Sequence, residues 1–446
     1  MRSEPIKRIN LEETPVNAAH EHTGNRSLRV ALWLAATLGT SAGFALVAPG
    51  ALPDSPMPAV PKLESIRPAI QSECKTPQPS SGVTAPLHVK GTYIYTPDSK
   101  EFIPYGMSVF GGNEQTHPLR VQYRLADRAQ IIAARKYWYS NTIRLQVAQY
   151  NLFSHIPKGD TYNPRFLRYV QSEANLAKKL GMRTIINDQT EDTQSHANNP
   201  TRKTPVFWQV MSNQFRCQGN VIFDIFNEPR AQHETNTATA ASSRWIWNEW
   251  ENGGMARTNK YIGMQQVVDV IRKKEKAKNL IIAETPYNDV GFEPKEFASH
   301  TLKGKDIVYS FHHVNLNQLR KWGKTIVREA KKYPLIDGEL SQFSSTRPEC
   351  YSSAYRNLPL LLKLLSKEHI GVIGWSLQYD SMVKSTDNRL VNDVYKGSEP
   401  ERASELSQPT TMDENYTCST QTGEGGGAIF MRDFKDNSVL YPVTAH

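Results

Sequence analysis

Short apolar runs alternate with longer amphipathic segments through most of the chain, and this alternation limits the fold more than any other feature. Eight of the runs are predicted to be strands: residues 100–111, 141–150, 182–188, 220–226, 279–285, 305–313, 334–340 and 370–377. Segments with the three-and-four apolar spacing of helices lie between most of them: 125–139, 165–181, 204–215, 261–275, 319–333 and 354–369. The strand runs are continuously apolar, so both of their faces are predicted to be covered.

Repeated strand–helix units predict a parallel sheet with right-handed crossovers. Eight such units close a barrel, so the fold class is α/β and the predicted architecture is a (β/α)8 TIM barrel over residues 87–446. A glycine run and an apolar segment at 416–434 are predicted to be the loop and the last helix that close it. A doubly wound open sheet is the alternative, but no glycine-rich phosphate-binding turn follows the first strand.

The first part of the chain differs, because residues 30–48 form an uncharged apolar run of nearly membrane-spanning length. Basic residues precede it in residues 1–29, so this tail is predicted to be cytoplasmic and the rest of the chain to lie outside. A transmembrane anchor is favoured over a cleaved signal sequence, because small-residue cleavage patterns are poor here. The predicted location is therefore the cell membrane, with a single pass, and secretion is the alternative. Residues 49–86 are rich in proline and serine and are predicted to be an extended linker.

Four cysteines are spread along the chain without a CxxC motif: Cys74, Cys217, Cys350 and Cys418. All four lie on the predicted outer side, where an even number of cysteines suits one or two disulfides. Their pairing stays open. The net charge is +9, but the basic residues are scattered rather than grouped in blocks, which argues against nucleic acid as a partner.

Polar residues stand at the ends of several predicted strands, and the carboxyl ends of the strands form the functional face of such a barrel. Arg144 lies inside the second strand, Asn227 and Glu228 follow the fourth, and Glu339 ends the seventh. The others at strand ends are Asp188–Thr190, His312, His313 and Trp375. The strands of Glu228 and Glu339 are well separated around the ring, so their carboxyl groups are predicted to face each other across the mouth. Two carboxylates that flank a cleft are what glycoside hydrolysis requires.

These strand ends lie within segments that resemble glycoside hydrolase family 5, the retaining β-glycanases that include many cellulases and mannanases. The matching segments are NTIRLQV (141–147), FW (207–208), VIFDIFNEP (221–229), W-x-W-x-x-W-x-x-G-G (245–254), YSFHH (309–313), YPLIDGE (333–339) and GVIGWSL (371–377). They follow the family's order and cover nearly the whole folded part.

The resemblance implies that Glu228 is the acid/base and Glu339 the nucleophile. A nearby arginine favours the ionised form that a nucleophilic carboxylate needs. The implied substrate-binding residues are the strand-two arginine near the nucleophile, the amide that binds the sugar 2-hydroxyl, the strand-six histidine and the tryptophan under the sugar ring: Arg144, Asn227, His312 and Trp375.

The chain departs from the family pattern at two positions. The family often has His-x-Tyr after strand six, where the tyrosine contacts the nucleophile, but this chain has Val314 at that place. The family tends to carry a histidine after strand three, where this chain has Thr190. Both changes bear on substrate choice and leave the two catalytic carboxylates in place. Three tryptophans either line a subsite or pack the insertion after strand four: Trp245, Trp247 and Trp250.

The sequence therefore predicts a retaining endo-β-glycanase that acts on a β-linked polysaccharide, with a β-1,4-glucan favoured. A β-mannanase or an exo-β-glucosidase is the alternative within the family, and a catalytically weak polysaccharide-binding barrel is the alternative outside it. No cofactor is expected. No metal is expected either, because the adjacent His312 and His313 point to opposite faces of a strand and no third ligand has metal spacing. The chain is predicted to act as a monomer.

Overall fold

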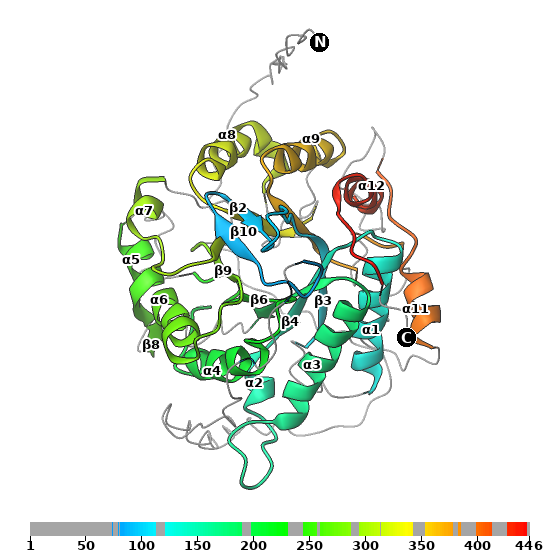
Figure 1. Ribbon diagram of the computed structural model, residues 1–446. Coiled ribbons are helices and arrows are strands. Elements are labelled where there is room, and N and C mark those ends of the chain that lie inside the picture. Colours follow the sequence, from blue (N-terminus) through cyan, green and yellow to red (C-terminus); the bar gives the residue numbers. More distant parts are fainter. Residues whose placement is uncertain are drawn as a thin grey trace, which may run out of the picture. The chain divides into compact units, whose positions relative to one another are not determined.

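Eight parallel strands form a closed barrel at the centre of the folded part of the chain (Figure 1). The computed structural model describes residues 74, 79, 81–112, 121–189, 198–230, 244–256, 259–286, 294–312, 314–341, 353–377, 382–384, 398–412 and 426–443, all within one compact unit, Ala59–His446. The barrel strands are β3 (Tyr105–Gly112), β4 (Thr142–Val147), β5 (Arg183–Asp188), β6 (Val221–Asp224), β9 (Ile281–Glu284), β10 (Ile307–His312), β11 (Leu335–Leu340) and β12 (Gly371–Gly374). Each pairs with the next, and β12 pairs with β3, so the predicted barrel is confirmed.

Helices surround the barrel and connect its strands (Figure 1). The helix α3 (Pro164–Lys179) begins with proline at its first position, and the Asn163 side chain caps it by accepting from the backbone N–H of Arg165 at 3.1 Å. It ends before Gly181, whose φ of +75° suits a residue without a Cβ. The other described α-helices are α1 (Val121–Lys136), α2 (Gln149–Leu152), α4 (Lys203–Phe215), α5 (Arg244–Asn252), α6 (Met264–Asp269), α7 (Pro294–Ser299), α8 (Leu319–Ala330), α9 (Ala354–Lys367), α11 (Glu399–Glu405) and α12 (Gly427–Asn437). A short π-helix, η2 (Val270–Lys274), continues α6, and a short 3-10 helix, η3 (Leu316–Gln318), precedes α8.

The insertion after β6 has more structure than the sequence predicted. Its tryptophan-rich stretch is the helix α5, which runs into an antiparallel hairpin of β7 (Gly253–Ala256) and β8 (Asn259–Ile262). The predicted helix 261–275 therefore begins later, because its first residues belong to β8. Gly253 explains the change of direction. Its φ is +87°, and a Cβ there would lie 2.7 Å from the Tyr261 carbonyl oxygen, so only glycine fits.

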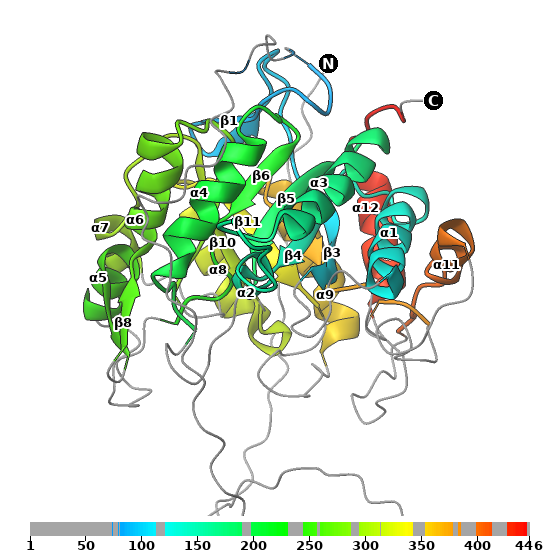
Figure 2. The same cartoon turned by 90° about the horizontal axis from the view of Figure 1, so that it is seen from below.

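Apolar side chains fill the amino-terminal end of the barrel interior, and a short hairpin covers that end. The hairpin strands are β1 (His88–Lys90) and β2 (Tyr93–Tyr95), and Figure 2 shows β1 at one end of the barrel. Leu87, Ile94 and Phe102, in and beside the hairpin, pack against the buried inner residues of six strands: Ile185, Ile222, Ile282, Val308, Ile336 and Ile373. This hairpin was not among the predicted strands. Because it seals one end with apolar contacts, the polar residues of the interior lie toward the other.

Arg183 and a disulfide attach the end of the predicted linker to the barrel. The buried Arg183 side chain donates to the carbonyl oxygens of Ala85 at 2.7 Å and Gly82 at 3.1 Å. Cys74 and Cys217 form a disulfide across 143 residues of sequence. At least one disulfide, as the cysteine count predicted, is therefore present.

The predicted tail and membrane segment, residues 1–29 and 30–48, lie outside the described residues, as do Cys350 and Cys418. Among the helices that the structure describes, none is long and apolar enough to cross a membrane. Membrane attachment and the location outside the cell therefore stay predictions.

Candidate active site

Glu228 stands just beyond the end of β6 in an uncommon backbone conformation. Its φ of +45° lies in the left-handed region, which costs a residue with a Cβ on the order of 1 kcal/mol. Two side chains hold the adjoining peptide groups. The Glu228 N–H donates to Glu284 Oε2 at 2.6 Å, and Asn198 Nδ2 donates to the Glu228 carbonyl oxygen at 2.7 Å. These two contacts hold the peptide groups on both sides of the Glu228 Cα and so fix the position from which its side chain extends.

Arg144 joins the strand ends around it. Its side chain lies inside the barrel, fully buried on β4. Nε donates to Asp224 at 2.8 Å, and Nη2 donates to Asn227 Oδ1 and Glu284 Oε1, both at 2.8 Å. Nη1 contacts Glu339 Oε1. The planar guanidinium therefore sets the positions of side chains from three other strands and from the Asn227 turn.

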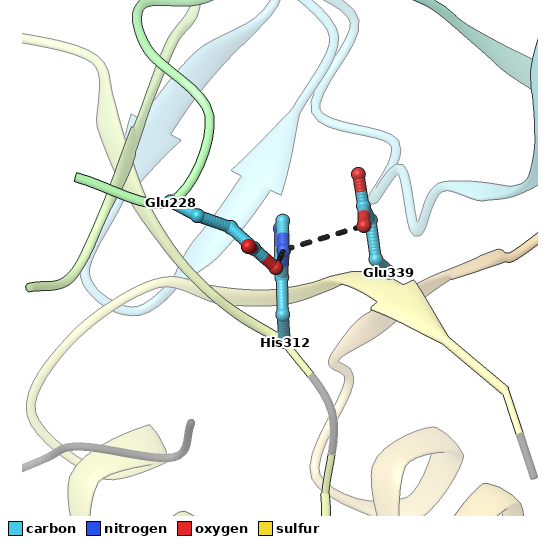
Figure 3. A group of neighbouring side chains, drawn as sticks. All are labelled: Glu228, His312 and Glu339. Carbon is cyan, nitrogen blue, oxygen red and sulfur yellow. Dashed lines mark hydrogen bonds and ion pairs between the residues drawn. The ribbon is translucent and has the colours of Figure 1, made fainter. Parts of the chain in front are cut away.

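His312, the last residue of β10, lies between the two predicted catalytic carboxylates (Figure 3). Its Nδ1 lies 3.1 Å from Glu228 Oε1 and 3.7 Å from Glu339 Oε2, and its Nε2 lies 3.3 Å from Glu284 Oε1. Gly338 makes room for the ring, because a Cβ there would lie 2.7 Å from Nε2. The imidazole is thus in contact with three carboxyl groups.

The buried charges of this cluster shift one another's pKa values. Burial by itself would lower the pKa of His312, but the Glu284 and Glu339 carboxylates hold it well above its usual value. Burial would also lower the pKa of Arg144, but its three carboxylate neighbours raise it. Burial would raise the pKa of Glu284, but His312 and Arg144 lower it. For Asp224, burial and the Glu284 charge raise the pKa well above its usual range. The cluster therefore holds two cations, an ionised Glu284 and an Asp224 that keeps its proton more readily.

Four carboxyl groups share the two cations, Arg144 and His312. Three belong to acidic residues that Arg144 contacts, and the fourth is that of Glu228. If all four were ionised, carboxylates would outnumber cations, which a buried site tolerates poorly. Protons on two of the four would balance the charge. Acid catalysis paired with a nucleophile requires one protonated and one ionised carboxyl group side by side.

The same residues raise the question of a metal ion. One oxygen of Glu228, one nitrogen of His312 and one oxygen of Glu339 all lie within 4.8 Å of one another, a set that could hold a cation. Sequence spacing could not reveal it, because the three residues come from different strand ends. A metal there would need a neutral His312, so its binding would have to release the proton that the raised pKa of His312 favours.

The fold brings together five of the six residues predicted to form the site: Arg144, Asn227, Glu228, His312 and Glu339. The sixth, Trp375, follows β12 and is half-buried; its backbone N–H donates to Leu340 at 2.9 Å, and its peptide bond to Ser376 is cis. The roles of all six stay predictions. Of the other strand-end residues, Thr190 and His313 lie outside the described part of the chain.

Two of the three tryptophans in the insertion pack its interior. Trp247 is fully buried, with its ring 5.5 Å from that of Trp250 and 5.3 Å from that of Phe297. The indole N–H of Trp250 donates to the Glu284 carbonyl oxygen at 2.8 Å. The packing alternative is thus confirmed for these two residues. The side chain of Trp245 lies outside the description.

Sequence reasoning missed four residues of the cluster: Asp224, Glu284, Gln146 and Asn198. Gln146 Nε2 donates to Glu339 Oε1 at 3.1 Å, so a strand-two amide supplies a donor to the carboxylate that the family's tyrosine would contact. Val314, at that tyrosine position, is fully buried. A signal existed for Glu284, because a carboxylate ends the apolar run of β9 as Glu228 follows that of β6. None existed for Asn198, which reaches the site only through the fold.

Comparisons with known proteins bear on the family and on the fold. A family model described as Cellulase (glycosyl hydrolase family 5) matches residues 98–381. Among solved structures, the catalytic domain of Thermobifida fusca endoglucanase Cel5A in complex with cellotetraose is 15% identical, with a TM-score of 0.51, and the match covers 80% of this chain and 100% of that one. The catalytic domain of alkaline cellulase K is 14% identical, with a TM-score of 0.52 and coverage of 83% and 98%.

A β-glucanase from Saccharophagus degradans in complex with cellotetraose is 15% identical, with a TM-score of 0.51 and coverage of 81% and 98%. At such identities these likenesses show the fold alone. A search of curated proteins finds no match to the sequence.

Proposed function

The chain belongs to glycosyl hydrolase family 5, and from that membership we propose that it is a retaining endo-β-glycanase that hydrolyses a β-1,4-glucan. Membership makes the protein a glycoside hydrolase. The retaining mechanism, the internal cleavage and the glucan are the proposal, and so are the roles of the individual residues.

One observation carries the retaining mechanism: a carboxylate oxygen of Glu228 and one of Glu339 lie within 4.8 Å of each other. Retaining enzymes need carboxyl groups about 5–5.5 Å apart, so that one can attack the sugar directly. Inverting enzymes need about 6.5–9.5 Å, which leaves room for a water molecule. The short separation therefore supports retention.

In the first step, a Glu339 oxygen attacks the anomeric carbon while Glu228 gives its proton to the departing glycosidic oxygen. This leaves a glycosyl ester on Glu339 and a carboxylate on Glu228. In the second step, Glu228 takes a proton from water, whose oxygen attacks the anomeric carbon and frees Glu339. Donation from Arg144 and from Gln146 at 3.1 Å keeps the nucleophile ionised and fixed. Asn227 Oδ1 accepts from Arg144, which orients the amide for the sugar 2-hydroxyl.

The choice of a β-1,4-glucan rests on relatives rather than on a bound ligand. Two of the similar structures contain cellotetraose, and the family model is named for cellulase. The β-mannanase and exo-β-glucosidase alternatives share the same carboxylate pair. The candidate of another class is a weakly catalytic polysaccharide-binding barrel. It is disfavoured because His312 contacts both carboxyl groups and Arg144 contacts Glu339, as a working pair of carboxyl groups would need.

The test is turnover of a panel of β-1,4-glucan, β-mannan and aryl β-glycosides by the full chain. We expect shorter oligosaccharides from the glucan, with the β-anomer formed first in proton NMR spectra. Replacing the nucleophile, Glu339→Gln, should lower kcat by at least about 10³-fold, whereas Glu405→Gln on α11 should leave it unchanged. An α-anomer formed first would overturn retention, and polysaccharide binding without any turnover would favour the binding barrel. Loss of activity in excess chelator would point to a metal at the Glu228–His312–Glu339 set.

A further inference from the structure

Glu284 is the last residue of β9 and connects both proposed catalytic carboxylates. Its side chain is buried, and both of its oxygens are in contact with N–H groups of neighbouring residues. Its Oε2 accepts from the Glu228 N–H at 2.6 Å. Its Oε1 accepts from Arg144 Nη2 at 2.8 Å and lies 3.3 Å from His312 Nε2. Arg144 in turn contacts Glu339. One buried carboxylate therefore links the backbone of Glu228 to the side chain that holds Glu339.

The backbone contact matters because Glu228 is held in the left-handed region, at φ +45°. Left alone, a glutamate would leave that region, since its Cβ crowds the following carbonyl. The bond from the Glu228 N–H to Glu284 and the bond from Asn198 to the Glu228 carbonyl act on the peptide groups either side of the Cα. A rotation of this Cα would move the Glu228 carboxyl group relative to Glu339.

The contacts require a carboxylate rather than any polar group of the same shape. Each oxygen of Glu284 faces N–H donors only: Glu228 N–H on one side, and Arg144 with His312 on the other. A glutamine has one acceptor oxygen and one NH2 group. Whichever way the amide is turned, its NH2 faces an N–H group, so one of the two links is lost.

We propose that Glu284 is a positioning residue for the acid/base Glu228: it fixes the Glu228 peptide group against Arg144 and so sets the spacing between Glu228 and Glu339. This inference rests on the proposed function. A misplaced acid slows departure of a poor leaving group, which needs protonation, and hardly affects a leaving group that departs as a stable anion. The dependence of the rate on the leaving group therefore separates a positioning role from a merely structural one.

The experiment compares kcat/KM of wild type and Glu284→Gln on two aryl β-cellobiosides, one with a phenyl and one with a dinitrophenyl leaving group. We expect kcat/KM on the phenyl glycoside to fall about 10²-fold, a size that a small misplacement of a catalytic group produces. The ratio of kcat/KM on the dinitrophenyl glycoside to kcat/KM on the phenyl glycoside should rise at least about tenfold relative to wild type. Glu228→Gln gives the upper limit of this widening.

Asp224→Asn is the matched control. It makes the same carboxylate-to-amide change in a buried partner of Arg144, at 2.8 Å, on the neighbouring strand β6. We expect it to lower kcat/KM on both glycosides by a common factor. If Glu284→Gln lowers kcat/KM on both substrates by the same factor, or does not lower it, the positioning role is overturned. The proposed function still stands in that case, because wild type turns the substrates over. Absence of wild-type turnover on every glycan would overturn both.

Asn198→Gly keeps the inference testable if Glu284→Gln does not fold, as judged by circular dichroism. It removes the second contact on the same residue without touching a buried charge, and glycine accepts the φ of +56° at position 198. We expect the same widening of the leaving-group ratio, at smaller size. An unchanged ratio in a folded Asn198→Gly protein would contradict the claim that these two contacts position Glu228.

Discussion

At the scale of single residues, the buried charges of the site stabilise one another. Arg144 and His312 are positive in the barrel interior because carboxylates contact both of them. Removing one partner would leave an uncompensated buried charge, which typically costs about 3–5 kcal/mol. This coupling explains why Glu284, which is proposed to have no direct part in the reaction, is in contact with the residues that are proposed to carry it out.

The raised pKa of His312 predicts a pH dependence of stability. Because its folded pKa lies above the unfolded value of 6.5, its contribution is fully present below about pH 6.5 and is lost as pH rises through the folded pKa. The free energy of unfolding should therefore fall above pH 6.5, by up to about 1.4 kcal/mol per pH unit. Urea unfolding measures this fall when it is carried out at pH 6 and at a series of higher pH values, on both sides of the unfolded pKa of 6.5. His312→Gln should remove it and His369→Gln should retain it; equal slopes in all three proteins would contradict the prediction.

At the scale of elements, the pairing of β10 with β11 decides whether the histidine fits. The register shifts between Phe311 and His312, and Gly338 faces the ring from the neighbouring strand. A Cβ at Gly338 would lie 2.4 Å from Ser310 Oγ and 2.7 Å from His312 Nε2, closer than real Cβ atoms approach. Position 338 on β11 therefore has to be glycine so that the His312 side chain on the neighbouring strand β10 has room.

Gly338→Ala should therefore both destabilise the protein and lower its activity. We expect a loss of about 1–3 kcal/mol in the free energy of unfolding, typical of overpacking, and a clear fall in kcat because the ring must move. Gly323→Ala in α8 is the control, since its Cβ would meet only Leu364 Cδ2, at 3.2 Å. Denaturant unfolding and glycan turnover measure the two effects. Unchanged activity in Gly338→Ala would show that His312 tolerates displacement.

At the scale of the whole described unit, contacts at the amino-terminal end of the barrel fasten the segment that enters it. Arg183, the β1–β2 hairpin and the Cys74–Cys217 disulfide all act there, at the end of the barrel opposite Glu228 and Glu339. A disulfide is typical of an exported protein, which agrees with the predicted location outside the cell. That location itself stays a prediction.

Loss of this disulfide should lower stability and spare activity. Cys217→Ser removes a link that closes a sequence separation of 143 residues, and such a loss typically costs about 2–4 kcal/mol. Denaturant unfolding should show a lower midpoint, and reductant added to wild type should lower its midpoint at least as far. Turnover of the glycan substrate under native conditions should remain near that of wild type. Coincident unfolding curves for variant and wild type would contradict the structural role.

The sequence by itself determined the barrel, its eight strands and five residues of the cluster, because strand periodicity and strand-end chemistry are local signals. Arg144, Glu228 and Glu339 were identifiable because each lies in or beside an apolar run whose end defines the functional face. Only the tertiary structure decided how Glu284, Gln146 and Asn198 join them. Their contacts link strands and loops far apart in sequence, and no spacing rule relates such positions. The same holds for the pKa shifts, which follow from distances and burial that only the closed barrel creates.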